Sequence, residues 1–338
     1  MTTQASSLYE IRPTESKGLG VFALRDILSG TRITAEKPLL IALREPGTID
    51  PITVYEAFEE LAPSQQQEYL RLYPAQKQTD FALQCMDDDL PVEIRNHVAK
   101  ISSIFESNAF RLGSEGKQNI DEVHEAGIFP TAARFNHSCV PNIAQTWNRL
   151  IGMMTIHSVR LIKAGEELCD GYTSLTDDIR TRQARLAAYG FVCSCEACSV
   201  ESLTGKTREL RREKIRKLEQ SLSLFTEQTK SVAGKKLVSN GNEVVKRHED
   251  VLKAVEELEG LLKEEGLVGH DLLRWYDYAA WYSATHQSQD LTAILQWQKK
   301  AYMLDLQIKG GDHEDTDLAR NRLTDLKHRD MAKVLTKG

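Results

Sequence analysis

The sequence predicts an α+β fold, in which a mainly β amino-terminal domain with a helical insertion is followed by an all-α carboxy-terminal domain of helical hairpins. Two patterns predict this fold class. Short apolar segments separated by glycine and proline occupy residues 8–45 and 127–172, whereas apolar residues recur at helical spacing over residues 51–111 and again beyond Ser199. The chain has 338 residues, 41% of them hydrophobic and 27% charged, so each domain has enough apolar side chains for a core of its own.

Extended segments and turns come first. Lys17-Gly18-Leu19-Gly20 places two glycines between apolar stretches, and Gly30 and Pro38 separate the stretches that follow. From Pro51 the apolar spacing becomes helical, and residues 175–189 are expected to form another helix. The apolar positions that predict the first helices are Val54, Phe58, Leu61, Tyr69, Leu70, Leu72, Val92, Val98, Ile101, Ile104 and Phe105.

Residues 200–338 are expected to form antiparallel helical hairpins. From Lys206 to Glu265 the chain is rich in Lys and Glu, with Leu or Val at helical intervals and interruptions at Gly234 and residues 239–241. Two longer amphipathic helices follow Gly269, and a last helix begins near Asp315. We interpret the aromatic residues of this region as helix-packing core rather than a ligand site; they are Trp275, Tyr278, Trp281, Tyr282, Trp297 and Tyr302.

The charge balance excludes some functions. Lys and Arg total 43 against 49 Asp and Glu, a net charge of −6, which argues against coating nucleic acid and is compatible with a basic peptide partner. The basic run at residues 206–212 is expected to be a solvated helix face. No apolar run reaches the about 18 residues of a membrane-spanning helix, and residues 1–10 lack a signal-peptide pattern. We therefore expect an intracellular protein, nuclear or cytoplasmic or both, with no membrane and no direct nucleic-acid partner.

Three of the six cysteines, Cys193, Cys195 and Cys198, fall within six positions. Zinc prefers four tetrahedral ligands, and thiolates on a tight turn can supply three of them. We expect a structural zinc site with Cys139 as the candidate for the fourth ligand. A histidine in that place, a redox pair and buried unliganded thiols are the alternatives. Cys169 is expected to be a small buried hydrophobic residue.

Three other short segments are each weak evidence of function. Gly18-x-Gly20 could be any hairpin turn, since it lacks the third glycine of a dinucleotide-binding fingerprint. Asn136-His137 could be a helix cap or a hydrogen-bonded core pair, and Tyr172 could be a buried aromatic residue.

Taken together and in this order, the segments resemble the SET-domain family of protein methyltransferases. The first strands of that family look like residues 17–23 followed by Gly30, Ile33 and Glu36. Asn136-His137-Ser138-Cys139-x-Pro141-Asn142 matches its most specific motif, and Gly165-Glu166-Glu167-Leu168 with Tyr172 matches the second. Phe191, just before the cysteines, resembles the aromatic residue of the zinc-binding post-SET segment.

The resemblance covers residues 8–199 and is greatest to the SMYD-like subfamily, which has a split SET domain and a helical carboxy-terminal region. That subfamily usually carries a cysteine-rich MYND finger inside the split, whereas residues 46–107 contain only Cys85. Partner recruitment through such a finger is therefore not expected.

The resemblance implies a SET domain over residues 8–199, with a helical insertion at about 46–107 and a post-SET zinc segment at 190–199, followed by a helical domain at 200–338. It implies two cofactors, S-adenosylmethionine and structural zinc. The implied zinc ligands are Cys139, Cys193, Cys195 and Cys198. The implied cofactor-binding residues are Lys17, Gly18, Leu19, Gly20, Asn108, Asn136, His137, Tyr172 and Phe191.

The implied function is S-adenosylmethionine-dependent methylation of a lysine amine in a protein, histone or non-histone. Tyr172 is the implied catalytic residue, because a phenol can orient the acceptor amine and favour its neutral form. Removing the proton of a free lysine at pH 7 costs about 4–5 kcal/mol. Two other functions stay open: a catalytically idle SET scaffold that binds partners through its helical domain, and methylation of a small-molecule amine. The presence of Asn136, His137, Tyr172 and Phe191 together argues against the idle scaffold.

Overall fold

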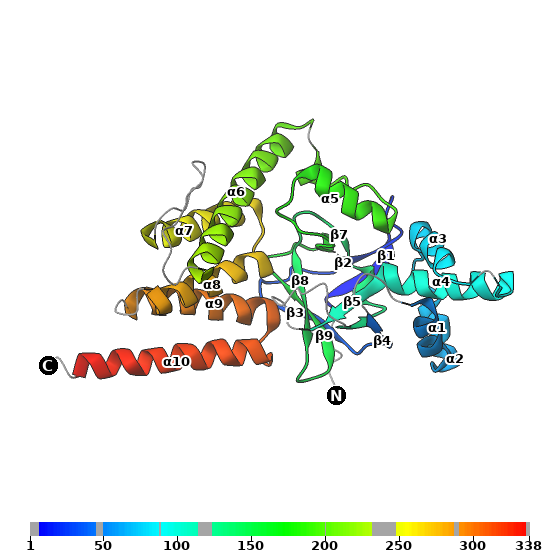
Figure 1. The fold of residues 1–338 in the computed structure, drawn as a ribbon, viewed down its shortest axis with the longest axis horizontal. Helices are drawn as coiled ribbons and strands as arrows, with labels where there is room; N and C mark the ends of the chain where they lie inside the picture. Colours follow the sequence, from blue (N-terminus) through cyan, green and yellow to red (C-terminus); the bar gives the residue numbers. More distant parts are fainter. Residues whose placement is uncertain are drawn as a thin grey trace. The chain divides into compact units, whose positions relative to one another are not determined.

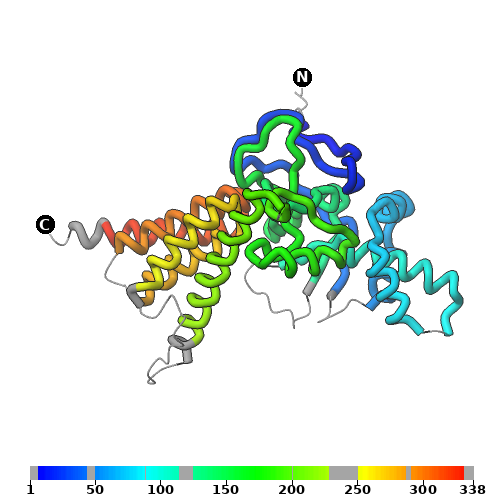
Figure 2. Tube along the Cα trace, turned by 90° about the horizontal axis from the view of Figure 1, so that it is seen from above, coloured from blue at the N-terminus to red at the C-terminus, as the bar shows by residue number. Residues whose placement is uncertain are grey.

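The computed structural model describes residues 7–44, 50–87, 89–113, 124–199, 201–231, 248–286 and 291–335 (Figures 1 and 2). The chain divides into two compact units. Unit 1 comprises residues 1–137, 142–172 and 183–193, and unit 2 comprises residues 138–141, 173–182 and 194–338. The predicted interruptions at Gly234 and residues 239–241 lie outside the described residues.

The strands belong to unit 1 and form three small sheets, with strand orders β1-β2-β10-β7, β3-β9-β8 and β4-β6-β5. Their bounds are β1 (Tyr9–Pro13), β2 (Leu19–Ala23), β3 (Arg32–Glu36), β4 (Leu40–Arg44), β5 (Ala109–Leu112), β6 (His124–Ile128), β7 (Asn136–His137), β8 (Ile143–Asn148), β9 (Met153–Ser158) and β10 (Glu167–Asp170).

The first sheet brings the three sequence motifs together. Strand β10 pairs antiparallel with β2, with Leu168 opposite Val21. On its other side β10 pairs parallel with β7, with Cys169 opposite Asn136. The glycine-rich turn, the Asn136-His137 motif and the Glu167 motif therefore lie on adjacent strands, although they are far apart in the sequence.

Apolar side chains behind these strands form the core of the β part of unit 1. Val21, Ile156 and Leu168 are almost fully buried, and the rings of Phe129 and Trp147 pack against each other at 5.9 Å between centroids. This core fixes the backbone positions of β2 and β10, on which the candidate site depends.

Four helices form the insertion between β4 and β5: α1 (Pro51–Glu59), α2 (Pro63–Tyr69), α3 (Gln76–Gln84) and α4 (Val92–Asn108). Asp50 caps α1 by accepting a hydrogen bond from the Ile52 backbone amide. Val54 and Phe58 pack with Ile101, Ile104 and Phe105, as their helical spacing predicts.

Two details of this region differ from the sequence prediction. Val92 is 60% exposed, because the first turn of α4 extends beyond the core. The helix ends at Asn108, and the next residues form strand β5 instead of the predicted continuation to residue 111. Pairing of β5 with β6 overrides the helical pattern there, since it satisfies the backbone hydrogen bonds of a short apolar segment.

The remaining helices are α5 (Ile179–Leu186), α6 (Leu203–Ser231), α7 (His248–Glu265), α8 (His270–His286), α9 (Leu291–Lys309) and α10 (Glu314–Leu335). In unit 2, α8 packs against α9 and α9 against α10, as hairpin topology requires (Figure 1). Trp275, Tyr282 and Trp297 are buried, which confirms their role as packing core, whereas Trp281 is 45% exposed. The predicted α+β fold class is confirmed.

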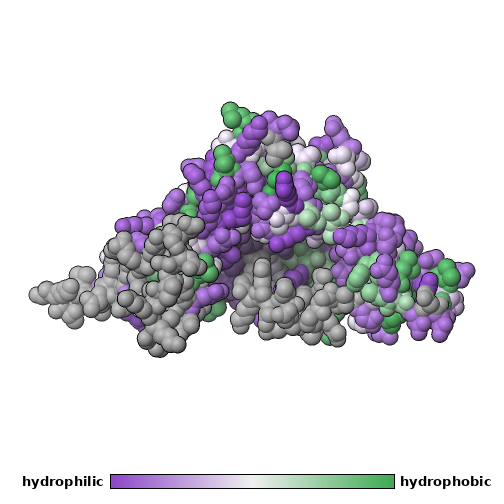
Figure 3. All heavy atoms as spheres, turned by 45° about the horizontal axis from the view of Figure 1, so that its top comes forward, coloured by the Kyte–Doolittle hydropathy of each residue, from purple (hydrophilic) through white to green (hydrophobic). Residues whose placement is uncertain are grey.

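Among the described residues, no helix is both long and apolar enough to cross a lipid bilayer. The described atoms visible in Figure 3 are mainly hydrophilic, and their hydrophobic residues occur in separate groups.

Candidate active site

The turn before β2 presents backbone to the site. Gly18 has a φ of +73°, a conformation that residues with a Cβ rarely adopt. Gly20 is a glycine for another reason: a Cβ there would lie 2.9 Å from Asn136 Nδ2 and 2.9 Å from Glu167 Oε1. The Asn136 and Glu167 side chains therefore lie directly against the backbone of Gly20.

Glu167 connects two of the predicted cofactor-binding residues. Its Oε2 accepts a hydrogen bond from Lys17 Nζ at 2.9 Å, and its Oε1 accepts one from Asn136 Nδ2 at 2.9 Å. Asn136 Nδ2 also donates to the Leu19 carbonyl at 3.0 Å. Burial is the largest single influence and would lower the pKa of Lys17, but the hydrogen bond to Glu167 and the negative charge nearby together outweigh it, and the pKa is raised. Lys17 therefore stays a cation at neutral pH.

These groups fit the amino-acid end of S-adenosylmethionine. An ammonium group (Lys17), a carboxylate (Glu167) and a carboxamide (Asn136) stand side by side around the side-chain-free Gly20, and the side chains of Lys17 and Glu167 are 40% and 20% exposed. A zwitterion needs this combination: cationic donors for its carboxylate and anionic or carbonyl acceptors for its ammonium group.

The aromatic predicted residues form one cluster with His137. The ring of the buried His137 lies 5.4 Å from that of Tyr172 and 6.1 Å from that of Phe191, between centroids. The rings of Tyr172 and Phe191 are 6.4 Å apart and nearly perpendicular. Because the Tyr172 backbone amide donates to His137 Nδ1 at 3.0 Å, the imidazole holds the backbone of the candidate catalytic residue.

The Tyr172 phenol is a neutral hydrogen-bonding group. Its hydroxyl donates to the Phe135 carbonyl at 2.6 Å. Burial, followed by the negative charge of Asp170, raises the pKa of Tyr172 far above its ordinary value. The phenol therefore does not act as a base near pH 7, but its oxygen keeps lone pairs that can accept an N–H donor.

Asn108 lies in the same unit without contacting the other predicted residues directly. Its Nδ2 donates to the Tyr73 carbonyl at 2.8 Å and to the Ile104 carbonyl at 2.7 Å. The Tyr73 hydroxyl in turn lies 3.1 Å from the position that a Cβ of Gly190 would occupy, next to Phe191. Asn108 thus contacts Tyr73, which lies beside Gly190.

Three residues of the site were given no role in the sequence analysis. Tyr189 places its ring 5.2 Å from that of Tyr172, and Glu167 holds Lys17 and Asn136 as described above. Asn142 joins two motifs: its Oδ1 accepts from the Cys169 amide, and its Nδ2 donates to the Glu167 carbonyl and to Glu166 Oε1. Both Glu167 and Asn142 lie inside the quoted motifs, so the signal was present, but only the fold shows what they contact.

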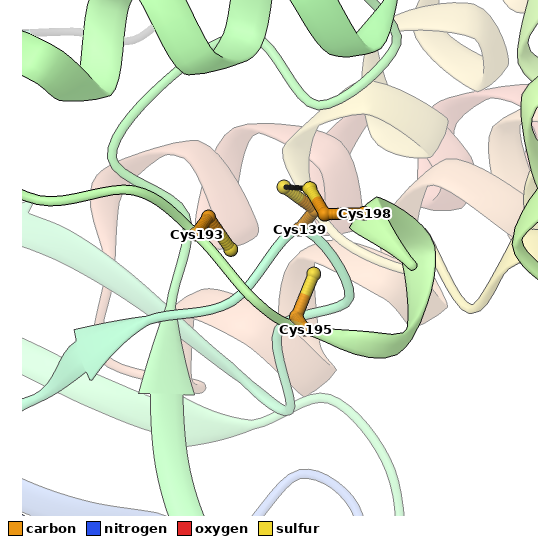
Figure 4. Close-up of side chains that lie close together, drawn as sticks. All are labelled: Cys139, Cys193, Cys195 and Cys198. Atoms are coloured by element: carbon orange, nitrogen blue, oxygen red, sulfur yellow. Dashed lines mark hydrogen bonds between the residues drawn. The ribbon is translucent and has the colours of Figure 1, made fainter. Parts of the chain in front are cut away.

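The four predicted zinc ligands lie together. One sulfur atom from each of Cys139, Cys193, Cys195 and Cys198 falls within 4.8 Å of every other, and Cys139 Sγ and Cys198 Sγ are 3.5 Å apart. Figure 4 shows the four side chains pointing toward one another. Four thiolates at about 2.3 Å from a tetrahedral zinc ion are roughly 3.8 Å apart, so the cluster fits zinc. Because the cluster already contains four sulfur atoms, the alternative of a histidine as fourth ligand is not needed.

Gln183 positions one of these ligands. Its Nε2 donates to the Cys193 carbonyl at 2.7 Å, and its Oε1 accepts from the Cys193 amide at 2.9 Å. This pair of bonds fixes the backbone between Phe191 and the cysteine cluster.

Comparison with known proteins agrees with this geometry. A family model described as "SET domain" matches residues 18–173. The protein named histone-lysine N-methyltransferase set5 of Schizosaccharomyces pombe is 31% identical over 217 residues, which cover 64% of this chain and 58% of that protein. The putative SET domain-containing protein L678 of Acanthamoeba polyphaga mimivirus is 28% identical over 254 residues, 71% of this chain and 94% of that protein. N-lysine methyltransferase SMYD2 of Homo sapiens is 35% identical over 94 residues, 28% of this chain and 20% of that protein. The chain thus spans little more than half of the S. pombe relative.

Proposed function

Residues 18–173 place this chain in the SET-domain family, and from that premise we propose that it transfers a methyl group from S-adenosylmethionine to the side-chain amine of a lysine in a protein. The observation that carries the proposal is the convergence of Gly20, Asn136, His137, Tyr172 and Phe191 within unit 1. We assign residues 8–199 to the catalytic domain, including its insertion and zinc segment, and residues 200–338 to the helical domain.

The cofactor supplies an electrophilic methyl group on a sulfonium, whose positive charge is dispersed during transfer, so the reaction needs positioning more than acid catalysis. We assign the binding of its amino-acid end to Lys17, Asn136, Glu167 and the backbone of residues 18–20. We assign the packing of its adenine to Phe191, and the support of that segment to Asn108.

Tyr172 orients the acceptor amine. The phenol donates its hydrogen bond to the Phe135 carbonyl. Its oxygen can therefore accept a hydrogen bond from an N–H of the incoming amine. An amine held by its hydrogens directs its lone pair elsewhere, toward the electrophile. The cluster of Tyr172, Tyr189 and Phe191 surrounds the amine with aromatic carbon, which disfavours the charged ammonium form.

A protein acceptor, histone or non-histone, is the proposed substrate class. The relatives' names, histone-lysine N-methyltransferase and N-lysine methyltransferase, support a lysine acceptor. The net charge of −6 favours a basic peptide segment as partner. Such substrates place the proposed activity in the nucleus, the cytoplasm or both.

The test is transfer of labelled methyl groups by the purified, zinc-loaded chain to core histones, peptide arrays and free amines. We expect label on protein lysine, located by mass spectrometry. Calorimetry with S-adenosylmethionine distinguishes the idle scaffold, which binds no cofactor, and labelling of free amines alone would identify a small-molecule methyltransferase.

Replacing Tyr172 with Phe tests the role of the phenol. We expect kcat to fall roughly 100-fold, the size usual for removing one preorganised hydrogen-bonding group at a reacting atom, while the cofactor Kd changes little. Tyr302→Phe, on α9 in the helical domain, is the matched control and is expected to keep wild-type turnover. A Tyr172→Phe enzyme with wild-type kcat would show that the phenol oxygen does not orient the amine.

A further inference from the structure

Two arginines beside the cysteine cluster have wholly buried side chains. Arg182 of α5 donates through Nη2 to the Ala197 carbonyl at 3.3 Å, and the same nitrogen lies 3.9 Å from Cys198 Sγ. Arg212 of α6 donates through Nη2 to the Cys139 carbonyl at 2.8 Å. Each guanidinium therefore contacts a residue that carries one of the four sulfur atoms.

The acidic side chains around these arginines do not balance them. The one wholly buried carboxylate of this described region, Glu265, pairs with Arg212 at 3.1 Å, and it also pairs with Arg208 at 3.3 Å and Arg211 at 2.6 Å. Arg208 and Arg211 have second acidic partners in Glu196 and Glu264, whereas Glu265 is the acidic partner described for Arg212. The acidic partner described for Arg182, Glu209, is 3.5 Å away and shares its charge with Arg216.

Arg182 shows the imbalance most clearly. Its side chain is 0% exposed, and among the described residues its Nε has no hydrogen-bond partner. A buried guanidinium without a nearby full counter-charge is strongly unfavourable, since desolvation costs several kcal/mol per ion before pairing offsets it. The folded chain thus lacks negative charge at this place.

We propose that the missing negative charge is the zinc-tetrathiolate centre itself, and that Arg182 and Arg212 are positioning residues that hold zinc through electrostatic attraction to its four thiolates. A Zn²⁺ ion with four thiolate ligands carries a formal charge of −2, and two of the four ligands here, Cys139 and Cys193, are buried. The two cations offset that charge, and the centre offsets theirs. The inference depends on the zinc site and is independent of methyl transfer.

The consequence is that zinc affinity depends on charges that do not touch the metal. Groups around the ligands of a metal site typically change its affinity 10- to 100-fold when they are removed. The zinc-loaded centre brings negative charge that Glu265 and Glu209 do not supply in full, so the charge-bearing side chains selectively favour the zinc-loaded protein. An arginine with a purely structural role would stabilise both forms equally and would leave the zinc affinity unchanged.

The experiment compares Arg182→Gln with Arg182→Lys in the full chain. Both side chains are shorter than arginine and keep hydrogen-bond donors, but only lysine keeps the charge. Zinc affinity is measured by competition with a chromophoric chelator, and Arg180→Gln, an exposed arginine on the same helix, is the matched control. We expect zinc binding 10- to 100-fold weaker for Arg182→Gln, near wild type for Arg180→Gln, and stronger for Arg182→Lys than for Arg182→Gln.

Equal zinc affinities of Arg182→Gln and Arg182→Lys, or an Arg182→Gln affinity equal to wild type, would overturn the proposal. So would a wild-type chain that binds no zinc. If the Arg182 variants do not fold, the same Gln and Lys pair at Arg212 decides the question, with the same expected order of affinities. Methyl transfer is not measured in this experiment, so its outcome leaves the proposed activity to be tested separately.

Discussion

Gly18 and Gly20 stand on either side of Leu19 at the start of β2, and each is a glycine for its own reason. Gly18 has a positive φ and open space around its Cα, so an added Cβ would meet no atom but would strain the backbone. Gly20 has a backbone that any residue can adopt, but an added Cβ would collide with Thr14, Asn136 and Glu167. One glycine serves the turn, and the other serves the candidate cofactor site.

Replacing each glycine with alanine separates the two effects. We expect Gly20→Ala to break the Asn136–Glu167 hydrogen bond and weaken S-adenosylmethionine binding about 10- to 100-fold, since a hydrogen bond to a charged group contributes about 1.5–3 kcal/mol. We expect Gly18→Ala to lower the free energy of unfolding by about 1–2 kcal/mol, the cost of a left-handed alanine. Calorimetry with the cofactor and urea denaturation measure the two quantities. Unchanged cofactor affinity in Gly20→Ala would remove Asn136 and Glu167 from the binding site.

The adjacent residues Glu166 and Glu167 show what a motif does not reveal. Glu166 pairs with Arg160 and accepts from the Lys163 amide and from Asn142, so it is a structural residue of the turn before β10. Burial is the largest single influence and tends to raise the pKa of Glu166, but the hydrogen bonds from Arg160, the Lys163 amide and Asn142 together outweigh it, and the pKa is lowered. Glu167 faces Lys17 and Asn136 instead. Sequence spacing placed both in one motif, and strand pairing gave them different tasks.

At the scale of elements, α6 joins several parts of unit 2 through its polar side chains. Glu219, with a side chain 15% exposed, accepts from Arg274 at 2.7 Å and from the Trp275 indole at 3.0 Å, both on α8, and from Thr176 at 3.2 Å. Burial raises the pKa of Glu219, although Arg274 opposes that shift. Glu219 therefore links α6 to α8, and its contribution to the free energy of unfolding depends on pH.

Replacing Glu219 with Gln tests this pH dependence. Because the pKa of Glu219 is higher in the folded than in the unfolded chain, the folded chain holds its proton longer as pH rises. The contribution to stability is therefore present below the unfolded pKa of about 4.3 and is lost as pH rises through the folded pKa. We expect the free energy of unfolding of wild type, minus that of Glu219→Gln, to decrease with pH across that window and then stay constant. Urea denaturation at a series of pH values measures it. A difference that increases with pH would mean that the ion pair with Arg274 dominates.

Helical and strand periodicity predicted the elements well because burial has the same period as the backbone. Val54, Phe58, Ile101 and Phe105 are buried where their spacing places them. The prediction was wrong at Val92, since a helix that extends beyond its core exposes apolar residues that keep the pattern. It was also wrong for residues 109–111, the end of the predicted helical region, where pairing with another strand decided the structure.

The site was predicted to the extent that its residues lie in contiguous motifs. The spacing of Cys193, Cys195 and Cys198 predicted a zinc site, and Cys139 was the candidate for its fourth ligand. The structure confirms that the four sulfur atoms lie together. Tyr189, Glu167 and the two buried arginines were not assigned because their partners are distant in sequence. A tyrosine or an arginine on a helix carries no sign of which loop it will face.

At the scale of the whole molecule, the two units are not contiguous segments. Residues 138–141 and 173–182 belong to unit 2, although both are flanked in the sequence by residues of unit 1. Cys139 lies in the first of these segments, and Cys195 and Cys198 follow residue 194, where the chain enters unit 2 again. The expected domain boundary at residues 199 and 200 stays a prediction.

Loss of a single thiolate tests how much of the molecule depends on the metal. We expect one zinc ion per wild-type chain, and a Cys195→Ser variant to lose most of it, because a zinc site needs four ligands to stay closed. Structural zinc can contribute on the order of 10 kcal/mol, and in a domain of 150–250 residues a loss of even about 3 kcal/mol lowers the Tm by roughly 6–12 °C. Elemental analysis by mass spectrometry and thermal unfolding measure both effects. Cys85→Ser, which changes an exposed cysteine outside the cluster, is the control and should keep zinc and Tm. A Cys195→Ser chain with full zinc content would mean that the ion, if present, binds elsewhere, and an unchanged Tm after zinc loss would mean that packing alone holds residues 138–141 and 194–198 in place.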